Sequence, residues 1–344
     1  MKVVIASTIV PFVEGGGTFI VDWLETVLRE RGHQVEVLKI PFHSHYLEMP
    51  SQWLALRLLD IADQGDRLIA IRTPSYLLRH PAKVLWFIHH HRGAYDLWGT
   101  EYQDLPNTPE GLAYRECIVR SDQLGFSEAR SIYTNSAVVA RRLKDYNDID
   151  AEVLYPPVFR PERYRCEEYG DYALYVSRIE SHKRQLLAIE SMRYTRTPVK
   201  LVIAGKGDAE GEQALRRAVE RHGVEQKVVL DLNWISEQKK IDYFARCLAV
   251  LYFPFNEDSY GYPSLEAHHA GKCVISTTDA GGAPELIVDG ENGFLTEPSP
   301  REIADRLDRL YRNRNLARDM GQAGTGRIHQ LGITWDRVEE RLLA

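Results

Sequence analysis

The chain has 344 residues, of which 44% are hydrophobic and 27% are charged. This length is enough for two domains with separate cores, and the composition excludes a disordered or low-complexity protein. The net charge of −6 does not provide the basic field that nonspecific binding to nucleic acid requires, so we expect no nucleic-acid partner.

The cysteines and the hydrophobic runs indicate a soluble cytoplasmic protein. The cysteines are Cys117, Cys166, Cys247 and Cys273. They are far apart with no C-x-x-C pair, which favours neither a disulfide framework nor a zinc site. The apolar run at residues 3–6 is too short for a signal peptide, and no stretch reaches the roughly 18 apolar residues of a spanning helix. A peripheral contact with the inner face of the membrane is compatible with these observations.

Short apolar runs alternate with amphipathic segments along the whole chain, which predicts parallel sheets covered by helices on both faces. In the first half we predict strands at residues 3–6, 35–38, 68–71, 84–88, 131–134 and 152–154, with a helix at 19–31. In the second half we predict strands at 173–177, 200–204, 227–230, 249–253, 273–276 and 294–296. The helices there are predicted at 210–221 and 237–246, with two more beginning near 183 and at 263.

The consecutive prolines within residues 155–158 interrupt this alternation, because proline lacks an amide donor and restricts the residue before it. We place the domain linker there, which gives domains at residues 1–157 and 158–330. Each half has the pattern of a doubly wound α/β sheet of the Rossmann type. Ligands of such sheets bind outside the carboxyl ends of the strands, so two facing sheets predict a site in the interdomain cleft.

The first predicted strand is followed by a glycine-rich loop with Gly15, Gly16 and Gly17. Glycines let backbone amides approach a ligand closely, and the helix that follows favours an anion at its N-terminus. The pattern is not G-x-G-x-x-G, so it is a poor dinucleotide fingerprint. A simple flexible turn is the alternative interpretation.

A second loop, between the strand at 173–177 and its helix, carries Arg178 and Lys183. We predict Ser181 as the N-cap, which places Lys183 in the first helical turn, where the helix dipole disfavours a cation. A bound diphosphate would offset that cost. This interpretation requires both cations to be available to a ligand and not committed to neighbouring acids. A surface lysine at a helix start is the alternative.

A third loop, after the strand at 249–253, carries Glu257 and Asp258 and leads into a short helix with Pro263 in its first turn and Glu266 beyond it. Glu266 could act as a capping carboxylate near the positive end of the helix. Alternatively, Asp258 and Glu266, eight positions apart across a turn, could face one ligand, with one carboxylate at a sugar and one at ribose hydroxyls.

These loops, in this order, resemble those of the family 4 retaining glycosyltransferases, the glycosyl transferases group 1. The family pattern Arg-x-x-x-x-Lys is matched by Arg178 and Lys183, and Glu-x7-Glu by Asp258 and Glu266, with Asp replacing the first Glu. The later elements Gly-Gly-x-x-Glu, Asn-Gly-Phe and the final helix are matched at residues 281–285, 292–294 and 333–338. Any one motif is weak, but the ordered set is specific.

The resemblance implies the GT-B fold, with two Rossmann-like domains facing an interdomain cleft. It implies an acceptor-binding domain at 1–157, a nucleotide-sugar-binding domain at 158–330 and a final helix at 331–344 that crosses back to the first domain. The implied activity is metal-independent transfer of a sugar from a UDP- or GDP-linked donor, without a cofactor, to a glycan or lipid-linked glycan acceptor. Residues 92–98 are a candidate acceptor wall, with interdomain packing as the alternative.

The resemblance also implies roles for individual residues. Arg178 and Lys183 would neutralise the departing diphosphate, and Glu266 would accept hydrogen bonds from the ribose. The remaining donor contacts would come from Gly15, Gly16, Gly17, Ser259, Tyr260, Gly261 and Tyr262, with Trp234 and Ile235 near the nucleobase. Spacing selects Asp258 for the donor sugar and side-chain length favours Glu257.

The family also has a histidine at the donor sugar, and we assign His89, the first of the three histidines at residues 89–91. A packed histidine and a metal site are the alternatives, but alternate residues of a strand face opposite ways, so at most His89 and His91 could share an ion.

Other functions compatible with this two-domain pattern are a sugar phosphorylase or sugar-nucleotide epimerase, a nicotinamide-dependent oxidoreductase, and a noncatalytic protein that binds sugar nucleotides. A product assay with and without an acceptor separates the phosphorylase or epimerase from a transferase. The missing G-x-G-x-x-G argues against the oxidoreductase.

Overall fold

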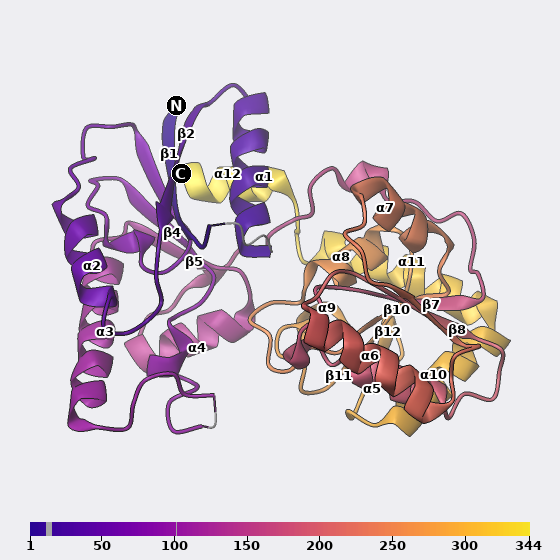
Figure 1. The fold of residues 1–344 in the computed structure, drawn as a ribbon. Helices are drawn as coiled ribbons and strands as arrows, with labels where there is room; N and C mark the ends of the chain where they lie inside the picture. Colours follow the sequence, from indigo (N-terminus) through magenta and orange to yellow (C-terminus); the bar gives the residue numbers. More distant parts are fainter. Residues whose placement is uncertain (12–15, 101) are drawn as a thin grey trace. The chain divides into compact units, whose positions relative to one another are not determined.

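The computed structural model describes residues 1–11, 16–100 and 102–344. The chain forms two compact units, one made of Met1–Pro156 with Thr334–Ala344 and the other of Pro157–Ile333 (Figure 1). Over the described residues, each unit contains a six-stranded sheet in which all paired strands are parallel. The predicted pair of doubly wound parallel sheets is therefore confirmed.

The first unit has the strand order β2-β1-β3-β4-β5-β6. Its elements are β1 (Lys2–Ile9), α1 (Gly16–Glu30), β2 (Gln34–Pro41), α2 (Met49–Leu58), β3 (Arg67–Ala70), η1 (Ser75–Leu77), β4 (Lys83–Phe87), η2 (Arg92–Ala94), α3 (Pro109–Ser127), β5 (Ser131–Thr134), α4 (Ala137–Asn147), β6 (Glu152–Val153) and α12 (Trp335–Leu343). β3 and β4 are buried along their whole length, as expected of central strands in a covered parallel sheet.

The last helix, α12, belongs to the first unit although the second unit precedes it in the chain. The Thr334 hydroxyl caps its start by accepting a bond from the amide of Arg337. Glu339 on α12 accepts from Arg31 and from His33 Nε2, the latter at 2.8 Å. These contacts attach α12 to the end of α1 and the start of β2.

The second unit has the strand order β12-β11-β10-β7-β8-β9. Its elements are η3 (Pro161–Arg163), β7 (Tyr172–Val176), η4 (Ser181–Lys183), α5 (Gln185–Met192), β8 (Lys200–Ala204), α6 (Ala209–His222), β9 (Val228–Asp231), α7 (Glu237–Arg246), β10 (Ala249–Tyr252), α8 (Tyr262–His269), β11 (Val274–Thr277), α9 (Ala283–Leu286), β12 (Gly293–Thr296), α10 (Pro300–Arg312) and α11 (Arg314–Gln330). The strand order reverses between β7 and β10, which marks the topological switch point of this sheet.

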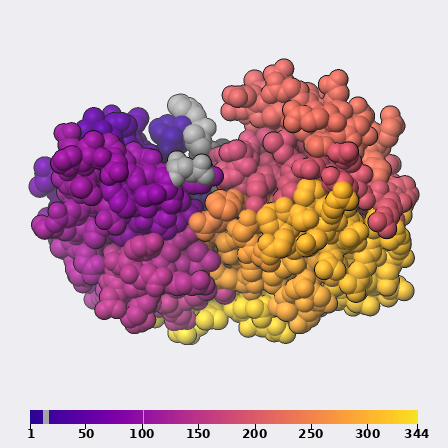
Figure 2. Space-filling model, turned by 90° about the horizontal axis from the view of Figure 1, so that it is seen from below, coloured from indigo at the N-terminus to yellow at the C-terminus, as the bar shows by residue number. Residues whose placement is uncertain are grey.

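Glycines allow α11 to pack closely on α8 in the second unit. A Cβ at Gly324 would lie 2.2 Å from the His268 ring, and one at Gly321 would lie 1.8 Å from the carbonyl oxygen of Gly271. The α10 and α11 segments contribute to the yellow surface of this unit in Figure 2. Among the residues that the structure describes, no helix combines the length and apolar character needed to cross a membrane.

Candidate active site

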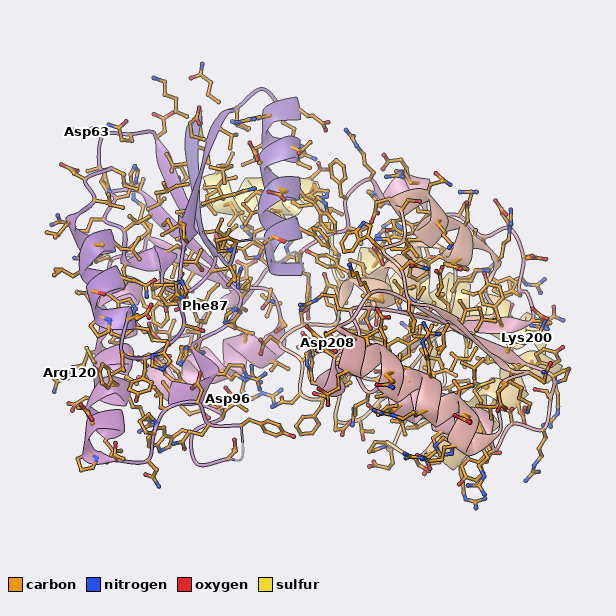
Figure 3. All side chains as sticks on the ribbon, in the orientation of Figure 1. Asp63, Phe87, Asp96, Arg120, Lys200 and Asp208 are labelled. Atoms are coloured by element: carbon orange, nitrogen blue, oxygen red, sulfur yellow. The ribbon has the colours of Figure 1, made fainter. Side chains whose placement is uncertain are left out.

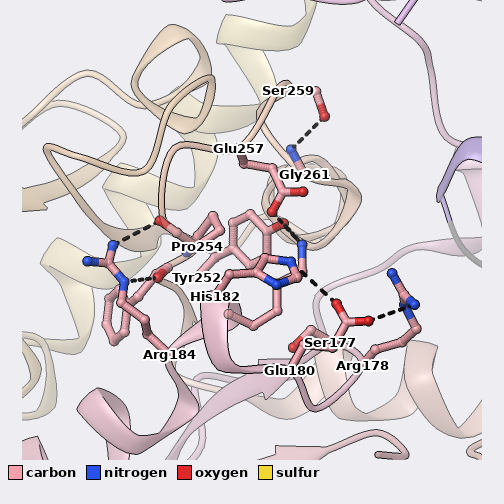
Figure 4. Close-up of polar contacts among 12 residues, drawn as sticks. Ser177, Arg178, Glu180, His182, Arg184, Tyr252, Pro254, Glu257, Ser259 and Gly261 are labelled. Atoms are coloured by element: carbon pink, nitrogen blue, oxygen red, sulfur yellow. Dashed lines mark hydrogen bonds and ion pairs between the residues drawn. The ribbon is translucent and has the colours of Figure 1, made fainter. Parts of the chain in front are cut away.

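The candidate site of the second unit is formed by the loops that follow β7, β10 and β11. These three strands are neighbours in the sheet and run parallel, so their carboxyl ends meet at one edge. The loops carry residues 177–184, 253–261 and 278–282, and the first two contain the Arg178, Lys183 and Asp258 positions. Figure 4 shows Arg178 of the first loop and Glu257 of the second. The site therefore lies at the switch point, where ligands of this type of sheet bind.

Lys183 lies against two residues of the β10 strand and loop. Its Nζ donates to the Glu257 carboxylate and, at 3.3 Å, to the Tyr252 hydroxyl, and it lies 5.6 Å from the centre of the Tyr252 ring. The Lys183 side chain is only 11% exposed. Burial raises the pKa of Tyr252, with Glu257 adding to the effect, so this hydroxyl stays protonated.

Arg178 is at the rim of the same loop and pairs with Glu180. The distance between Arg178 Nη1 and Glu180 Oε1 is 2.7 Å, and half of the Arg178 side chain is exposed. His182 Nε2 lies 3.3 Å from the other oxygen of Glu180, and burial together with Lys183 lowers the pKa of His182. Arg178 and Lys183, the two cations predicted to bind a diphosphate, thus each have a carboxylate partner in the structure. The sequence-based interpretation required both cations to be free of neighbouring acids, so this condition is not met.

The predicted helix start at Ser181 is wrong. Residues Ser181–Lys183 form a short 3-10 turn, and α5 begins only at Gln185. Between them Arg184 adopts the left-handed conformation with φ of 54°. Lys183 therefore lies before the helix, and the helix dipole does not act on it as a first-turn residue.

Arg184 explains that interruption, because its guanidinium joins the three loops. It donates to the carbonyl oxygens of Phe253 and Pro254 at 2.7 and 2.8 Å (Figure 4). It also forms a bidentate pair with Asp279 at 2.7 and 2.8 Å. A planar guanidinium suits this geometry, whereas a lysine would not. Sequence reasoning missed Arg184 and Asp279, although Arg184 is adjacent to Lys183 and Asp279 nearly adjoins the glycine pair.

Glycines bring these loops into backbone contact. A Cβ at Gly281 would lie 2.1 Å from the carbonyl oxygen of Glu257, and one at Gly282 would lie 2.5 Å from the carbonyl carbon of Ser259. The amide of Gly282 donates to the Glu257 carbonyl at 3.1 Å. At Gly261, with φ of +73°, a Cβ would lie 2.2 Å from the Tyr252 ring. The glycines of the family pattern therefore serve the close packing of the loops.

Glu257 is the carboxylate that the structure places against Lys183. Asp258 follows it in the same loop and is partly exposed. Of the predicted backbone contacts, Tyr260 is buried, and the Ser259 hydroxyl accepts a bond from the amide of Gly261 at 3.4 Å. Which of the two carboxylates meets the donor sugar stays a prediction.

Glu266 lies on α8, five residues beyond Gly261, and is 2% exposed. Its Oε1 accepts one bond from the Tyr164 hydroxyl and one from Lys240 Nζ, each at 2.7 Å. Sequence reasoning identified Glu266 but neither donor. Trp234 and Ile235, predicted near the nucleobase, lie in the loop after β9, where Trp234 is 65% exposed.

The remaining predicted donor contacts belong to the first unit. Gly15 lies outside the described residues. Gly16 and Gly17 begin α1, and a Cβ at Gly17 would lie 3.5 Å from the Arg72 side chain. Arg72 in turn donates to the carbonyl oxygen of Thr8 at 3.1 Å, at the carboxyl end of β1.

The three histidines after β4 have different surroundings. His89 is partly exposed, and its Nδ1 lies 2.8 Å from the carbonyl oxygen of His90. His90 is buried and bonds to Asn147 at 2.9 Å, and burial lowers the pKa of His90 to about 4. His91 faces Asp104 at 3.2 Å. Within the part of the chain that the structure describes, no group of three or more histidine, cysteine, aspartate or glutamate side chains is arranged to hold a metal ion.

The candidate acceptor segment at residues 92–98 is internally paired. Asp96 accepts from Arg92 at 2.6 Å and faces Arg142 of α4 at 3.2 Å (Asp96 is labelled in Figure 3). The Tyr95 hydroxyl donates to the buried Asp122 of α3 at 2.7 Å. This segment is thus anchored to the first unit by α3 and α4.

Comparisons with known proteins agree with this fold. Residues 162–327 match the family model of the glycosyl transferases group 1. The human alpha-1,3/1,6-mannosyltransferase ALG2 is 28% identical over 316 residues, which cover 81% of this chain and 72% of that protein. Sucrose-phosphate synthase from Thermosynechococcus elongatus superposes with a TM-score of 0.78 at 15% identity, covering 99% of this chain and 97% of that one. HepE from Anabaena superposes with a TM-score of 0.73 at 16% identity, covering both chains completely.

The two doubly wound sheets therefore define the GT-B fold. Residues 162–327, most of the second unit, therefore form a glycosyl transferases group 1 domain, and the protein is a glycosyltransferase. The matched region covers most of the second unit, including Lys183, Glu257 and Glu266.

Proposed function

We propose that this glycosyltransferase moves a sugar from a nucleoside diphosphate to a hydroxyl acceptor, with retention of the anomeric configuration and without a metal ion. The observation that carries the proposal is the position of Lys183, mostly buried at the switch point and within reach of the loops after β7 and β10. A leaving diphosphate gains charge in the transition state, and a fixed cation aimed at it lowers the barrier.

The carboxylate partners of the two cations are compatible with this role. An ammonium group carries three donors, and among the described residues Lys183 Nζ uses two of them, on Glu257 and Tyr252. One donor is left for a phosphate oxygen. Arg178 is half exposed, and pairs at such exposed positions contribute only about 0–1 kcal/mol, so a diphosphate can take over Arg178 at small cost.

The other assignments complete the proposed donor site. Glu266 binds the ribose, the backbone from Ser259 to Tyr262 holds the sugar or phosphate, and Trp234 and Ile235 lie near the base. Asp258 or Glu257 and His89 contact the donor sugar, and Gly15 to Gly17 close over the donor. The Anabaena HepE structures, described as complexes with UDP and with UDP-glucose, support a nucleotide donor for this fold.

The donor is identified by incubating the protein with UDP-glucose, UDP-N-acetylglucosamine, GDP-mannose and UDP-galactose, and measuring the release of UDP or GDP. The mannosyltransferase name of the human relative is the reason to include GDP-mannose. We expect slow hydrolysis of one donor without an acceptor and faster turnover with a glycan or lipid-linked glycan. Nuclear magnetic resonance of the product then reads the anomeric configuration. Conversion of a sugar nucleotide to its epimer, or turnover that requires inorganic phosphate, would contradict the proposal.

The acceptor class, the cytoplasmic location and a contact with the inner membrane face stay predictions from the family resemblance. Sedimentation of the protein with vesicles of anionic phospholipid tests the membrane contact. A glycan acceptor is tested by product formation on soluble and lipid-linked oligosaccharides in parallel.

A further inference from the structure

The Glu266 carboxylate is held in an asymmetric way. Its two donors come from different elements, Tyr164 from the residue after η3 and Lys240 from α7, and both bonds end on the same atom, Oε1. Among the residues that the structure describes, no donor bonds to Oε2. The Glu266 side chain is 3% exposed, and Oε2 is not among the fully buried oxygens without a partner, so this oxygen keeps a small opening to solvent.

The two donors are themselves fixed in place. Lys240 is also 3.0 Å from Glu237, one turn earlier on α7, and only 15% of its side chain is exposed. The Tyr164 ring packs edge-on against Phe244 of α7 at 5.9 Å and lies 6.4 Å from the ring of His269 of α8. Tyr164 is thus packed against α7 and α8, and Lys240 is held by a second carboxylate.

The Glu266 carboxylate is paired with a cation. Burial opposes the charge of Lys240, but Glu266 and Glu237 more than offset it and raise the pKa of Lys240. Lys240 is thus an ammonium, and its Nζ lies 2.7 Å from Glu266 Oε1. An ionised carboxylate accepts hydrogen bonds about twice as strong as those to a neutral acceptor.

Glu266 also lies close in the chain to the loop that contacts Lys183. α8 begins at Tyr262, directly after the loop that holds Glu257 against Lys183. We propose that Lys240 and Tyr164 are positioning residues, which fix Glu266 through Oε1 so that Oε2 accepts a hydrogen bond from a ribose hydroxyl of the nucleotide. This inference rests on the proposed function, because it assumes a nucleoside diphosphate donor.

The test compares nucleotides that differ by one hydroxyl. UDP and GDP are each titrated into the protein by calorimetry together with their 2′-deoxy and 3′-deoxy forms. We expect the unmodified protein to bind the ribose form at least about tenfold more tightly than one of the deoxy forms, as a charged hydrogen bond provides. In Lys240→Met this preference falls to less than about threefold, because Glu266 loses its charge partner.

Tyr164→Phe removes only a hydroxyl and also reduces the preference, which provides a second variant if Lys240→Met does not fold. Lys240→Arg restores the charge and recovers part of the preference. The control is Lys200→Met, which removes a half-exposed lysine from its pair with Asp171 at the amino end of β8 (labelled in Figure 3). This control keeps the preference of the unmodified protein.

The possible outcomes separate the positioning role of Lys240 and Tyr164 from the proposed function. If the folded Lys240→Met and Tyr164→Phe variants bind all nucleotides more weakly but keep the full ribose preference, the positioning role is wrong while the proposed function stands. If the unmodified protein binds nucleotide without any ribose preference, the positioning role is wrong as well. If it neither binds nor turns over any nucleotide sugar of the panel, the proposed function itself fails.

Discussion

The two units organise the carboxyl ends of their strands in different ways. In the second unit the loops after β7, β10 and β11 touch one another through backbone and are joined by Arg184. In the first unit the corresponding region is held by side chains of distant elements, such as Asp122 of α3, which accepts from Tyr76 and Tyr95 at 2.6 and 2.7 Å.

This difference explains why the second unit carries the recognisable motifs. Backbone contact between loops requires glycine at fixed positions, such as Gly281 and Gly282, and these positions appear in the sequence as a pattern. A network of side chains such as Asp122, Tyr76 and Tyr95 has no local spacing, because its members come from residues tens of positions apart. The predictions below test this contrast.

The largest expected effect comes from Gly281→Ala. The new Cβ would lie 2.1 Å from the Glu257 carbonyl oxygen, so the loops must separate. We expect the free energy of unfolding of the second unit to fall by about 3 kcal/mol or more and glycosyl transfer to be lost. The measurement is urea denaturation together with nucleotide release.

The matched control for this prediction is Gly290→Ala. Gly290 has a similar φ of +77°, but nothing lies within 4 Å of its added Cβ. Its cost should be limited to the backbone strain, about 1 kcal/mol. Equal losses for the two variants would show that strain, and not contact between the loops, makes glycine necessary.

The pH dependence of stability should also separate the units. Burial lowers the pKa of His268 and of His269 to about 4, so both contribute stability above pH 6.5 that is lost as the pH falls toward 4. Each accounts for up to about 3 kcal/mol. In the first unit His90, with a pKa of about 4, also contributes stability that is lost as the pH falls. Burial raises the pKa of Asp122 to about 6. The contribution of Asp122 to the free energy of unfolding therefore grows as the pH falls, and it offsets the stability lost at His90.

We therefore expect acid to destabilise the second unit first. Hydrogen exchange measured by mass spectrometry at pH 7, 5.5 and 4.5 reports both units in the same intact protein. The substitution His269→Gln should make the protection of the second unit against exchange depend less steeply on pH. The pH dependence of protection in the first unit should stay unchanged. A steeper loss of protection against hydrogen exchange in the first unit would contradict the expectation that acid destabilises the second unit first.

Lys183→Met tests the chemistry of the second unit without its loop packing. A charged hydrogen bond is worth about 1.5 to 3 kcal/mol, so turnover should fall at least about tenfold to a hundredfold. Lys200→Met serves as the lysine control, and urea denaturation of both variants shows whether the loss of turnover exceeds any loss of folded protein. Turnover close to that of the unmodified protein would remove Lys183 from the proposed mechanism.

The smallest effect is expected for Arg184→Lys, which keeps the charge but loses the planar fork that bonds to Asp279 and the Phe253 and Pro254 carbonyls. We expect the free energy of unfolding to fall by about 1 kcal/mol, with a severalfold loss of turnover because the Lys183 turn is less firmly held. Arg193→Lys, at an exposed arginine that follows α5, is the control. No change in either quantity would show that the glycine contacts alone hold the loops.

The sequence by itself was sufficient for the architecture and for the family. Apolar runs alternating with amphipathic segments predicted two doubly wound sheets, because that periodicity reflects burial on both faces of a parallel sheet. The ordered motifs around Lys183, Asp258 and Glu266 indicated a group 1 glycosyltransferase, since their spacing is local to single loops. The roles of these residues in binding and catalysis stay predictions.

Only the tertiary structure decided how those motif residues are held. Tyr164 and Glu266 are 102 positions apart, and Lys183 and Glu257 are 74 apart, so packing and not spacing brings them together. The same reason accounts for the wrong N-cap at Ser181. Arg184 leaves the helical conformation as it bonds to loops about 70 and 95 residues away, and no local pattern encodes that contact.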